Sequence, residues 1–468
     1  MPKHLLPSLL AAASGLLFTL AAQDAAPPAA VPPKPANPAG APKPPLTPAA
    51  PPSDPFIRDP AAQKPPKPPA RAEAARDAVN LLTTIETWSL SQADFAAILD
   101  GPADERAPYD QLEELAKAGK AKLVGLMAIN SKSGLRAVVE SMNEVRYPTE
   151  FDPAGRVGEI AFPVAWEARN AGDTLEVEPI LGPDGKTIDV NLVPQVVLFD
   201  GFKEWQQPNF HTAKVMTSLY VQSGRPAFLS TASPVAAADA EGDAQVRIRT
   251  LRVTAQPALP APPLGGELVN LRVEFLLYSI DREAARHILN KASDSVQSYA
   301  AVRDLLGRNE ARLESVSSFV AKSGHRSVND ELFELRFPEG MNSPPSKGPA
   351  NTPPEARRSA SPRAFAVRNT GVTLEVEPVL GPEGRIVMIN MVPKVVRFSG
   401  MHIAGGVAAK YPPQPVFTVR TLTTSVSSGA GVPVLLGTFN QPGETGADEP
   451  KDHGRTVLAY ARVTPVRP

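Results

Sequence analysis

Two glutamates on one short stretch have the spacing that comes nearest to a catalytic pair. Glu176 and Glu178 lie two positions apart in TLEVEPILGPDGKTIDVNLVPQVV (174–197), and Glu375 and Glu377 repeat the spacing in TLEVEPVLGPEGRIVMINMVPKVV (373–396). Side chains two apart on a β-strand share a face at about 7 Å, a separation that inverting glycosidases use. The alternative is the solvent-facing side of an amphipathic strand. Because no aromatic platform or apolar pocket surrounds the glutamates in sequence, we favour the alternative.

The other residue types that could do chemistry do not form a site either. The histidines lack i, i+4 or HxH spacing, which argues against a metal site; they are His4, His211, His287, His325, His402 and His453. His325 follows Ser323 in the turn AKSGHR (321–326), where a serine nucleophile with a histidine base is one possibility. The similar turn SKSGLR (131–136) has Leu135 in place of the histidine, so we interpret His325 as a turn residue. GPDG and GPEG lack the strand-to-helix context of a phosphate loop. We predict no catalytic, cofactor-binding or metal site, no cofactor and no enzymatic activity.

Charge and cysteine content exclude several further classes. Lys and Arg number 48 against 49 for Asp and Glu, a formal net charge of -1. This balance provides no basic patch for nucleic acid or for an anionic membrane surface. Cysteine is absent, which excludes disulfides, thiolate nucleophiles, Cys-type zinc sites and lipid attachment through an N-terminal cysteine.

The N-terminus predicts export. Lys3 and His4 precede the apolar run LLPSLLAAASGLLFTLAA (5–22), which ends on the small residues Ala21 and Ala22. This is the pattern of a cleaved signal peptide over residues 1–22; an uncleaved anchor is the alternative. We expect a periplasmic or outer-membrane-associated protein of a Gram-negative-type cell.

Residues 23–72 are rich in proline and alanine, as in PPKPANPAGAPKPPLTPAAPP. Proline fixes its own φ and favours extended geometry before it, so the segment predicts polyproline II or disorder. At about 3.1 Å per residue it could reach on the order of 150 Å. We interpret it as a disordered spacer; a PxxP-type docking ligand is the alternative.

The remaining chain contains an internal repeat. VNLLTTIETWSLSQADFAAIL (79–99) aligns with VNLRVEFLLYSIDREAARHIL (269–289), and SKSGLRAVVESMNEVRYP (131–148) with AKSGHRSVNDELFELRFP (321–338). QPNFHTAKVMTSLYVQSGRPAFLST (207–231) aligns with QPVFTVRTLTTSVSSGAGVPVLLGT (414–438). Such long repeats indicate duplicated domains. We predict a first half at 73–258, a linker at 259–267 and a second half at 268–468.

Each half predicts an antiparallel sheet with two short helices. A β-branched run at 79–89 is typical of a strand, and Ser91 and Asp281 stand where helix N-caps are expected. A second helix in each half should stop at Gly119 and at Gly307. The fold class is therefore α+β, predominantly antiparallel β, with two tandem domains after the spacer.

The repeated glutamate stretch predicts a hairpin. Leu175, Val177 and Pro179 should face the side opposite to the glutamates, and GPDG should reverse the chain with glycine at positive φ. On the returning strand Ile188, Val190 and Leu192 should face inward. Asp189 and Asn191 alternate with them and should face outward.

Four stretches of this sequence resemble the core domain of the secretins, the outer-membrane channel subunits of type II, type III and type IV pilus systems. They are VNLRVEFLLYSID, SKSGLRAVVESMNEVRYPTEFDP, RNTGVTLEVEPVLGPEGRIVMINMVPKVV and QPVFTVRTLTTSVSSGAGVPVLLGTF. The likeness is greatest to secretin-like proteins of the Verrucomicrobia type. Residues 232–244 and 440–454 are short, polar and rich in Gly, Pro and Ala where secretins carry a VPxLGxIPxxGxLF-type stretch.

The resemblance implies a non-enzymatic envelope protein that acts by protein–protein assembly, as a structural or accessory component of a secretion or pilus system. The expected partners are other envelope proteins, such as a secretin or pilus machine, or further copies of the chain, without nucleic acid or a small-molecule substrate. A ring-forming outer-membrane secretin subunit and a soluble cell-wall or glycan-binding module are the alternatives.

Overall fold

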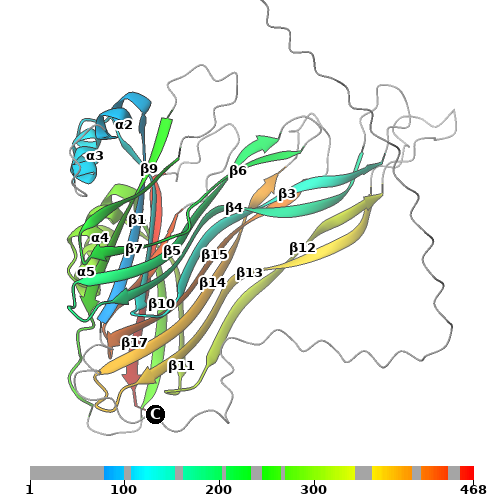
Figure 1. Cartoon of the computed structure of the whole chain (residues 1–468). Coiled ribbons are helices and arrows are strands. Elements are labelled where there is room, and N and C mark those ends of the chain that lie inside the picture. Colours follow the sequence, from blue (N-terminus) through cyan, green and yellow to red (C-terminus); the bar gives the residue numbers. More distant parts are fainter. Residues whose placement is uncertain are drawn as a thin grey trace, which may run out of the picture. The chain divides into compact units, whose positions relative to one another are not determined.

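The computed structural model describes residues 79–99, 107–152, 162–202, 207–232, 245–264, 269–342, 361–402, 413–440 and 454–467. All of them fall within one compact unit, Lys67–Pro468. They form three layers, in which helices cover the outer face of one sheet and a second sheet lies against its inner face (Figure 1). The expected signal peptide and spacer lie outside the described residues.

The first sheet, called sheet A, lies under the helices. Its eight strands are antiparallel to their neighbours and combine both halves of the chain. Their order is β11 (Arg312–Ala321), β10 (Asn270–Asp281), β17 (Arg455–Val466), β16 (Val434–Asn440), β2 (Lys122–Lys132), β1 (Val79–Ser91), β9 (Gln245–Pro257) and β8 (Pro226–Ala232).

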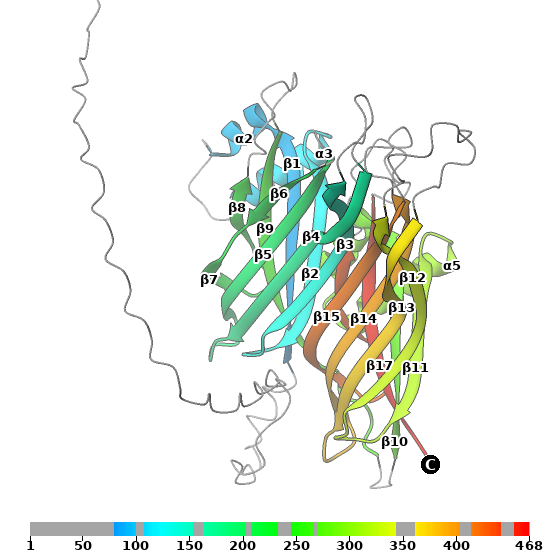
Figure 2. The ribbon, with the colours of Figure 1, turned by 90° about the vertical axis from the view of Figure 1, so that its right-hand side faces the viewer.

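The second sheet, sheet B, has nine strands. It also combines both halves of the chain, as Figure 2 shows. Its order is β12 (Ser327–Asn342), β13 (Ser361–Leu380), β14 (Ile386–His402), β15 (Gln414–Gly429), β3 (Ala137–Asp152), β4 (Phe162–Leu181), β5 (Thr187–Phe202) and β6 (Pro208–Lys214), with β7 (Thr217–Gln222) pairing β5 beside β6. Predominantly antiparallel β-structure is thus confirmed. The division into domains at 73–258 and 268–468 stays a prediction, because strands of both ranges share both sheets.

Four helices are described, two in each half: α2 (Gln92–Leu99), α3 (Ala107–Lys117), α4 (Arg282–Lys291) and α5 (Ser295–Gly307). Both expected N-caps are confirmed, since Ser91 Oγ accepts from Asp94 N at 3.1 Å and Asp281 Oδ1 from Ala284 N at 3.1 Å. Gly119 follows α3 at φ 73° as expected, whereas after α5 the left-handed residue is Asn309, at φ 61°. Helix α5 ends at Gly307 as expected. The left-handed position beyond it is occupied by asparagine, which also tolerates this conformation.

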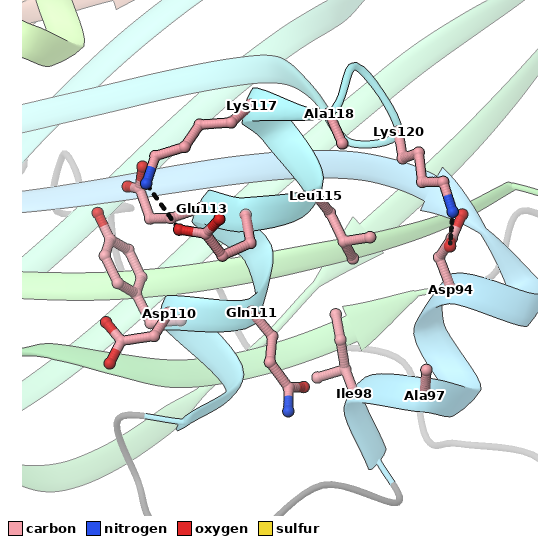
Figure 3. A pocket seen from close by; sticks show the side chains of 12 residues that line it. Asp94, Ala97, Ile98, Asp110, Gln111, Glu113, Leu115, Lys117, Ala118 and Lys120 are labelled. Atoms are coloured by element: carbon pink, nitrogen blue, oxygen red, sulfur yellow. Dashed lines mark hydrogen bonds and ion pairs between the residues drawn. The ribbon is translucent and has the colours of Figure 1, made fainter.

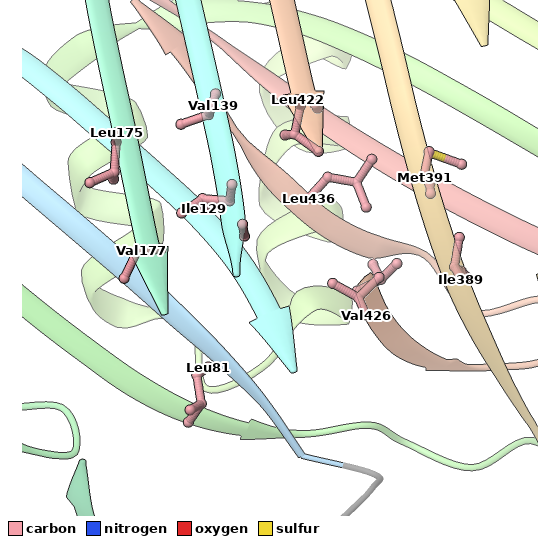
Figure 4. Close-up of a cluster of buried hydrophobic side chains, with 14 of the residues drawn as sticks. Leu81, Ile129, Val139, Leu175, Val177, Ile389, Met391, Leu422, Val426 and Leu436 are labelled. Atoms are coloured by element: carbon pink, nitrogen blue, oxygen red, sulfur yellow. The ribbon is translucent and has the colours of Figure 1, made fainter. Parts of the chain in front are cut away.

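The main core lies between the two sheets. Alternate residues of strands from both halves meet there (Figure 4), among them Leu81, Ile129, Val177, Ile389 and Leu436. A second cluster lies between sheet A and the helices α4 and α5, and a third between sheet A and α2 and α3. Since one core runs through both halves, neither half buries its apolar faces alone.

The predicted hairpin is confirmed. Residues Gly172 to Leu181 of β4 pair with Ile188 to Val197 of β5, and Gly185 lies at φ 67°. The inward residues are buried and the glutamates are not. Hydrogen bonds from the Thr187 hydroxyl and from two backbone N–H groups lower the pKa of Asp184 to about 2, so this carboxylate stabilises the turn.

Gly437 allows β16 of the second half to approach β2 of the first. A Cβ at this position would lie 2.6 Å from the Ala128 carbonyl oxygen and 3.0 Å from Leu422 Cδ1. Gly437 is also the residue that pairs with Ile129 across this boundary. A side chain there would have to separate the two strands.

We expect Gly437→Ala to lower the free energy of unfolding by about 1–3 kcal/mol, because the added methyl group overpacks the boundary between β16 and β2. Urea unfolding measures the effect. Gly307→Ala is the matched control, since its Cβ meets no atom within 4 Å and alanine favours a helix. Equal effects of the two substitutions would contradict a close approach at Gly437.

Candidate assembly interface

The glutamates singled out by their spacing belong to ion pairs on the outer face of sheet B. Glu176 Oε2 lies 2.6 Å from Arg136 Nη2, and Glu375 Oε1 lies 2.6 Å from Arg326 Nε. Glu178 and Glu377 are half-exposed on the same strands. An ion-paired carboxylate beside solvent lacks the apolar surroundings of a catalytic acid. The positions of these glutamates therefore agree with their interpretation as the solvent-facing side of an amphipathic strand.

Ser323 and His325 do not form a nucleophile pair. His325 Nδ1 lies 3.4 Å from the carbonyl oxygen of Ser323, while the Ser323 hydroxyl accepts from Leu380 N at 3.0 Å. Ser133 accepts from Leu181 N at 2.9 Å in the same way. These serines hold each turn against the following hairpin. Within the described ranges no group of three His, Asp or Glu residues could hold a metal ion; His4 and His453 lie outside those ranges.

An open groove of about 770 Å³ lies between α2 and α3 (Figure 3). Both lysines that line it are paired: Lys117 Nζ lies 2.7 Å from Glu114 Oε1, and Lys120 Nζ lies 3.4 Å from Asp94 Oδ1. Glu113, which also lines it, pairs with Arg286. The cations that line the groove are therefore already paired with carboxylates of the protein itself.

The most extensive contact between the halves is strand pairing in sheet B. Strand β15 of the second half pairs antiparallel with β3 of the first, from Phe417 opposite Glu144 to Thr423 opposite Val138. Thr418 Oγ1 donates to Asn143 Oδ1 at 2.7 Å across the pair. This boundary and the adjoining one between β16 and β2 are called the internal joint.

Buried polar side chains complete the internal joint in sheet A. Thr438 Oγ1 accepts from Ala128 N at 2.8 Å, Asn440 Oδ1 accepts from Leu126 N at 3.1 Å, and Asn130 Nδ2 donates to the Leu435 carbonyl oxygen at 2.9 Å. These side chains bind backbone groups that regular strand pairing would otherwise use. Since unpaired buried polar groups are costly, they favour this one register.

A buried arginine of α4 joins the two halves above sheet A. Arg286 Nε lies 3.1 Å from Glu86 Oε1 on β1, a second nitrogen pairs with Glu113 on α3, and the guanidinium carbon lies 4.7 Å from the ring centre of Trp88. The side chains of Arg286 and Glu86 are only 11% and 4% exposed. Asn290 Nδ2 also donates to Glu86 at 3.1 Å.

A carboxylate also lies at the internal joint. Asn440 Nδ2 donates to Asp173 Oδ2 at 2.5 Å. Burial raises the pKa of Asp173, an effect that the Asn440 hydrogen bond and the nearby Arg282 and Arg249 partly offset. The charged form of Asp173 is therefore less favourable in the folded state than in water.

Each sheet has two open edges, one contributed by each half. The second-half edge comprises β11 and β12, and the first-half edge comprises β8, β6 and β7; no described strand pairs along their outer sides, apart from one contact of Gly340 with Ala165. Large apolar side chains are exposed along both edges. They are Leu313, Val316, Val320, Val328, Leu332 and Phe333 on the second-half edge, and Met216, Tyr220 and Phe228 on the first-half edge.

The aligned positions within the internal joint are buried. Phe333 is 68% exposed, whereas Asn143, which aligns with it, is 5% exposed beneath β15. Tyr220 is 76% exposed, whereas Ser427, which aligns with it, is 2% exposed. The residues exposed on the open edges thus align with residues of the other half that are buried at the internal joint.

Sequence reasoning missed the joint residues, although the repeat held a signal for them. Arg286 aligns with Ala96, Glu86 with Leu276, and Asn130 with Val320. A charged or polar residue that is replaced by an apolar one in the other half marks a contact made by only one of the halves.

No family model matches the chain, and no curated protein matches it. Among solved structures, the secretin GspD of the ETEC pilotin–secretin AspS–GspD complex is 12% identical over 38% of this chain and 49% of that chain, with a TM-score of 0.20. The type II secretin GspD of enteropathogenic Escherichia coli is 12% identical over 38% of this chain and 66% of that chain, with a TM-score of 0.20. The type IV competence pilus secretin PilQ of V. cholerae is 9% identical over 83% of this chain and 60% of that chain, with a TM-score of 0.20.

This chain thus spans about half to two thirds of the length of these solved chains, and the structural resemblance to secretins is weak. No helix of the described residues has the length and apolar character to cross a membrane.

We expect Arg286→Ala to destabilise the protein by about 3–5 kcal/mol, because it leaves Glu86 buried without its cation. Adding Glu86→Leu, the residue type found at the aligned Leu276, should restore most of the loss. Thermal unfolding of both variants measures this. Arg308→Ala removes an exposed ion pair to Asp304 and serves as control, with an expected cost below about 1 kcal/mol. The absence of rescue would contradict a pairwise role.

We expect Asp173→Asn to maintain or increase stability at neutral pH, because the amide resembles the protonated carboxyl. A carboxyl whose pKa is raised on folding costs stability above that pKa, and the cost disappears as the pH falls towards the ordinary value of 3.8. The difference between variant and wild type should therefore narrow on acidification. Chemical unfolding from neutral to acidic pH tests this; a constant difference would refute it.

Proposed function

We propose that this protein is a non-enzymatic, exported envelope protein that acts by assembly, as a structural or accessory component of a secretion or pilus system. The sequence resemblance to the secretin core and the expected signal peptide support the location and the system. The open strand edges support assembly as the mode of action.

The exposure of apolar residues on the open edges carries the proposal. An exposed strand edge presents unpaired N–H and C=O groups that accept another strand. Protein edges are usually protected by charge, proline or cover, yet Phe333, Val316 and Tyr220 lie exposed on these edges. Such surfaces are typical of binding sites for other protein chains.

A ring-forming channel subunit is the second candidate. Within this chain the second half joins the first by unlike surfaces, and unlike-surface contacts generate rings when the rotation closes. A ring subunit should form a heat- or detergent-resistant multimer in the outer-membrane fraction, whereas an accessory protein should not.

We expect Phe333→Lys to release the protein from its envelope assembly, because a charge replaces the most exposed apolar side chain of β12. The full chain is expressed in an exporting Gram-negative host, chemically cross-linked, fractionated and sized. Wild type should co-fractionate in a large assembly and the variant near monomer size.

Leu135→Lys is the matched control, since Leu135 is an exposed leucine in the turn between β2 and β3, away from the open edges. It should behave as wild type. If Phe333→Lys and Leu135→Lys both leave the assembly intact, edge-mediated assembly is wrong.

A further inference from the structure

The strand order repeats from one half to the other in both sheets. Sheet A runs β11-β10-β17-β16 through the second half and then β2-β1-β9-β8 through the first, and these strands correspond in that order. Sheet B likewise runs β12-β13-β14-β15 and then β3-β4-β5-β6. The surface equivalent to β2 and β3 is therefore open at β11 and β12, and that equivalent to β16 and β15 is open at β8, β6 and β7.

We propose that each open edge binds the opposite open edge of a second copy of this chain, so that chains join head to tail with β6 of one chain paired to β12 of the next. This proposal rests on assembly through the open edges and names the partner. The contact is heterologous, because each side uses a different surface.

The register of the internal joint fixes which residues should meet. Thr421 pairs with Glu140 in the internal joint, and Lys214 and Asp330 occupy the aligned positions. Both side chains are exposed, and neither is in an ion pair within the described part of the chain. Opposite charges directly across an antiparallel pair attract. The edges are thus complementary in charge as well as in shape.

The same register brings a second carboxylate towards a buried arginine that already lies near Asp173. Arg249 is 4% exposed, and its Nη2 donates to the Ala213 carbonyl oxygen at 3.3 Å. Ala213 aligns with Arg420, which pairs with Ser141, so the residue across from Ala213 in the next chain is Glu331. Glu331 is exposed in the single chain. A head-to-tail joint would bring its carboxylate beside Arg249, and buried arginine is favoured when so paired.

The outer joint differs from the internal joint in chemistry. Val320 replaces the buried Asn130, and Ser230 stands where Gly437 lets β16 approach β2. Strand β8 therefore cannot approach β11 as closely, and the outer joint relies on β6 with β12. Because of this difference, an open edge should pair with the open edge of another chain and should not replace a strand of the internal joint.

Cysteine cross-linking tests the register in a chain that has no cysteine of its own. Thr212→Cys and Leu332→Cys are made in separate full-length chains, since the aligned residues Val419 and Met142 pair in the internal joint. Mixing the two under mild oxidation should give a 1:1 disulfide-linked dimer. Val419→Cys with Met142→Cys in one chain is the positive control and should close internally; Leu135→Cys is the negative control.

Charge reversal tests the direction of the joint. Lys214→Asp and Asp330→Lys should each weaken self-association by about tenfold, because like charges then face each other. A mixture of the two variants should associate again and extend as alternating chains, since each edge of one variant then faces an opposite charge on the other variant. Sedimentation velocity of the purified chains measures both effects, and failure of the mixture to associate overturns the proposal.

Preferential linkage of Thr212→Cys to itself would also overturn it, because that contact is between like edges. If purified wild type stays monomeric and the mixed cysteine variants stay uncross-linked, while Phe333→Lys still abolishes the envelope assembly, the self-contact is wrong and edge-mediated assembly with another protein stands. If neither self-association nor loss of assembly is observed, both are wrong.

Discussion

The antiparallel pairing of β15 with β3 is the contact on which the rest of the structure depends. It continues sheet B from one half of the chain into the other, and the adjoining pairing of β16 with β2 continues sheet A in the same way. The apolar core then runs without interruption beneath both halves. Burial of that core supplies the main favourable free energy, but it can form only in the register that the strand pairing sets.

Polar contacts at the internal joint add specificity to that pairing. Thr438, Asn440 and Asn130 bind backbone groups of the opposite half, and Arg286 is enclosed by acidic and aromatic side chains of the first half. An error in register would leave these groups buried and unpaired, which is more costly than the loss of their attraction. The joint is therefore selective as well as stable.

The open edges have a different character, because they carry apolar and oppositely charged residues instead of the buried polar set. A chain with one polar joint inside and one apolar edge at each end has distinct surfaces for folding and for assembly. This separation allows the chain to fold as a single compact unit while its ends remain available to other chains. On the outer face of sheet B, Glu176 and Glu375 pair with Arg136 and Arg326, which gives that face a polar, solvated surface.

The sequence by itself determined the local elements. The alternation in 174–197 predicted the hairpin, Ser91 and Asp281 predicted the helix starts, and the repeat predicted that both halves would contain matching strands, because these signals depend on neighbours a few residues away. It did not reveal that Asn309 takes the left-handed conformation after α5, nor that Arg286 meets Glu86. Only the tertiary structure decided which edges close and which stay open, because strand pairing between halves depends on residues that lie hundreds of positions apart.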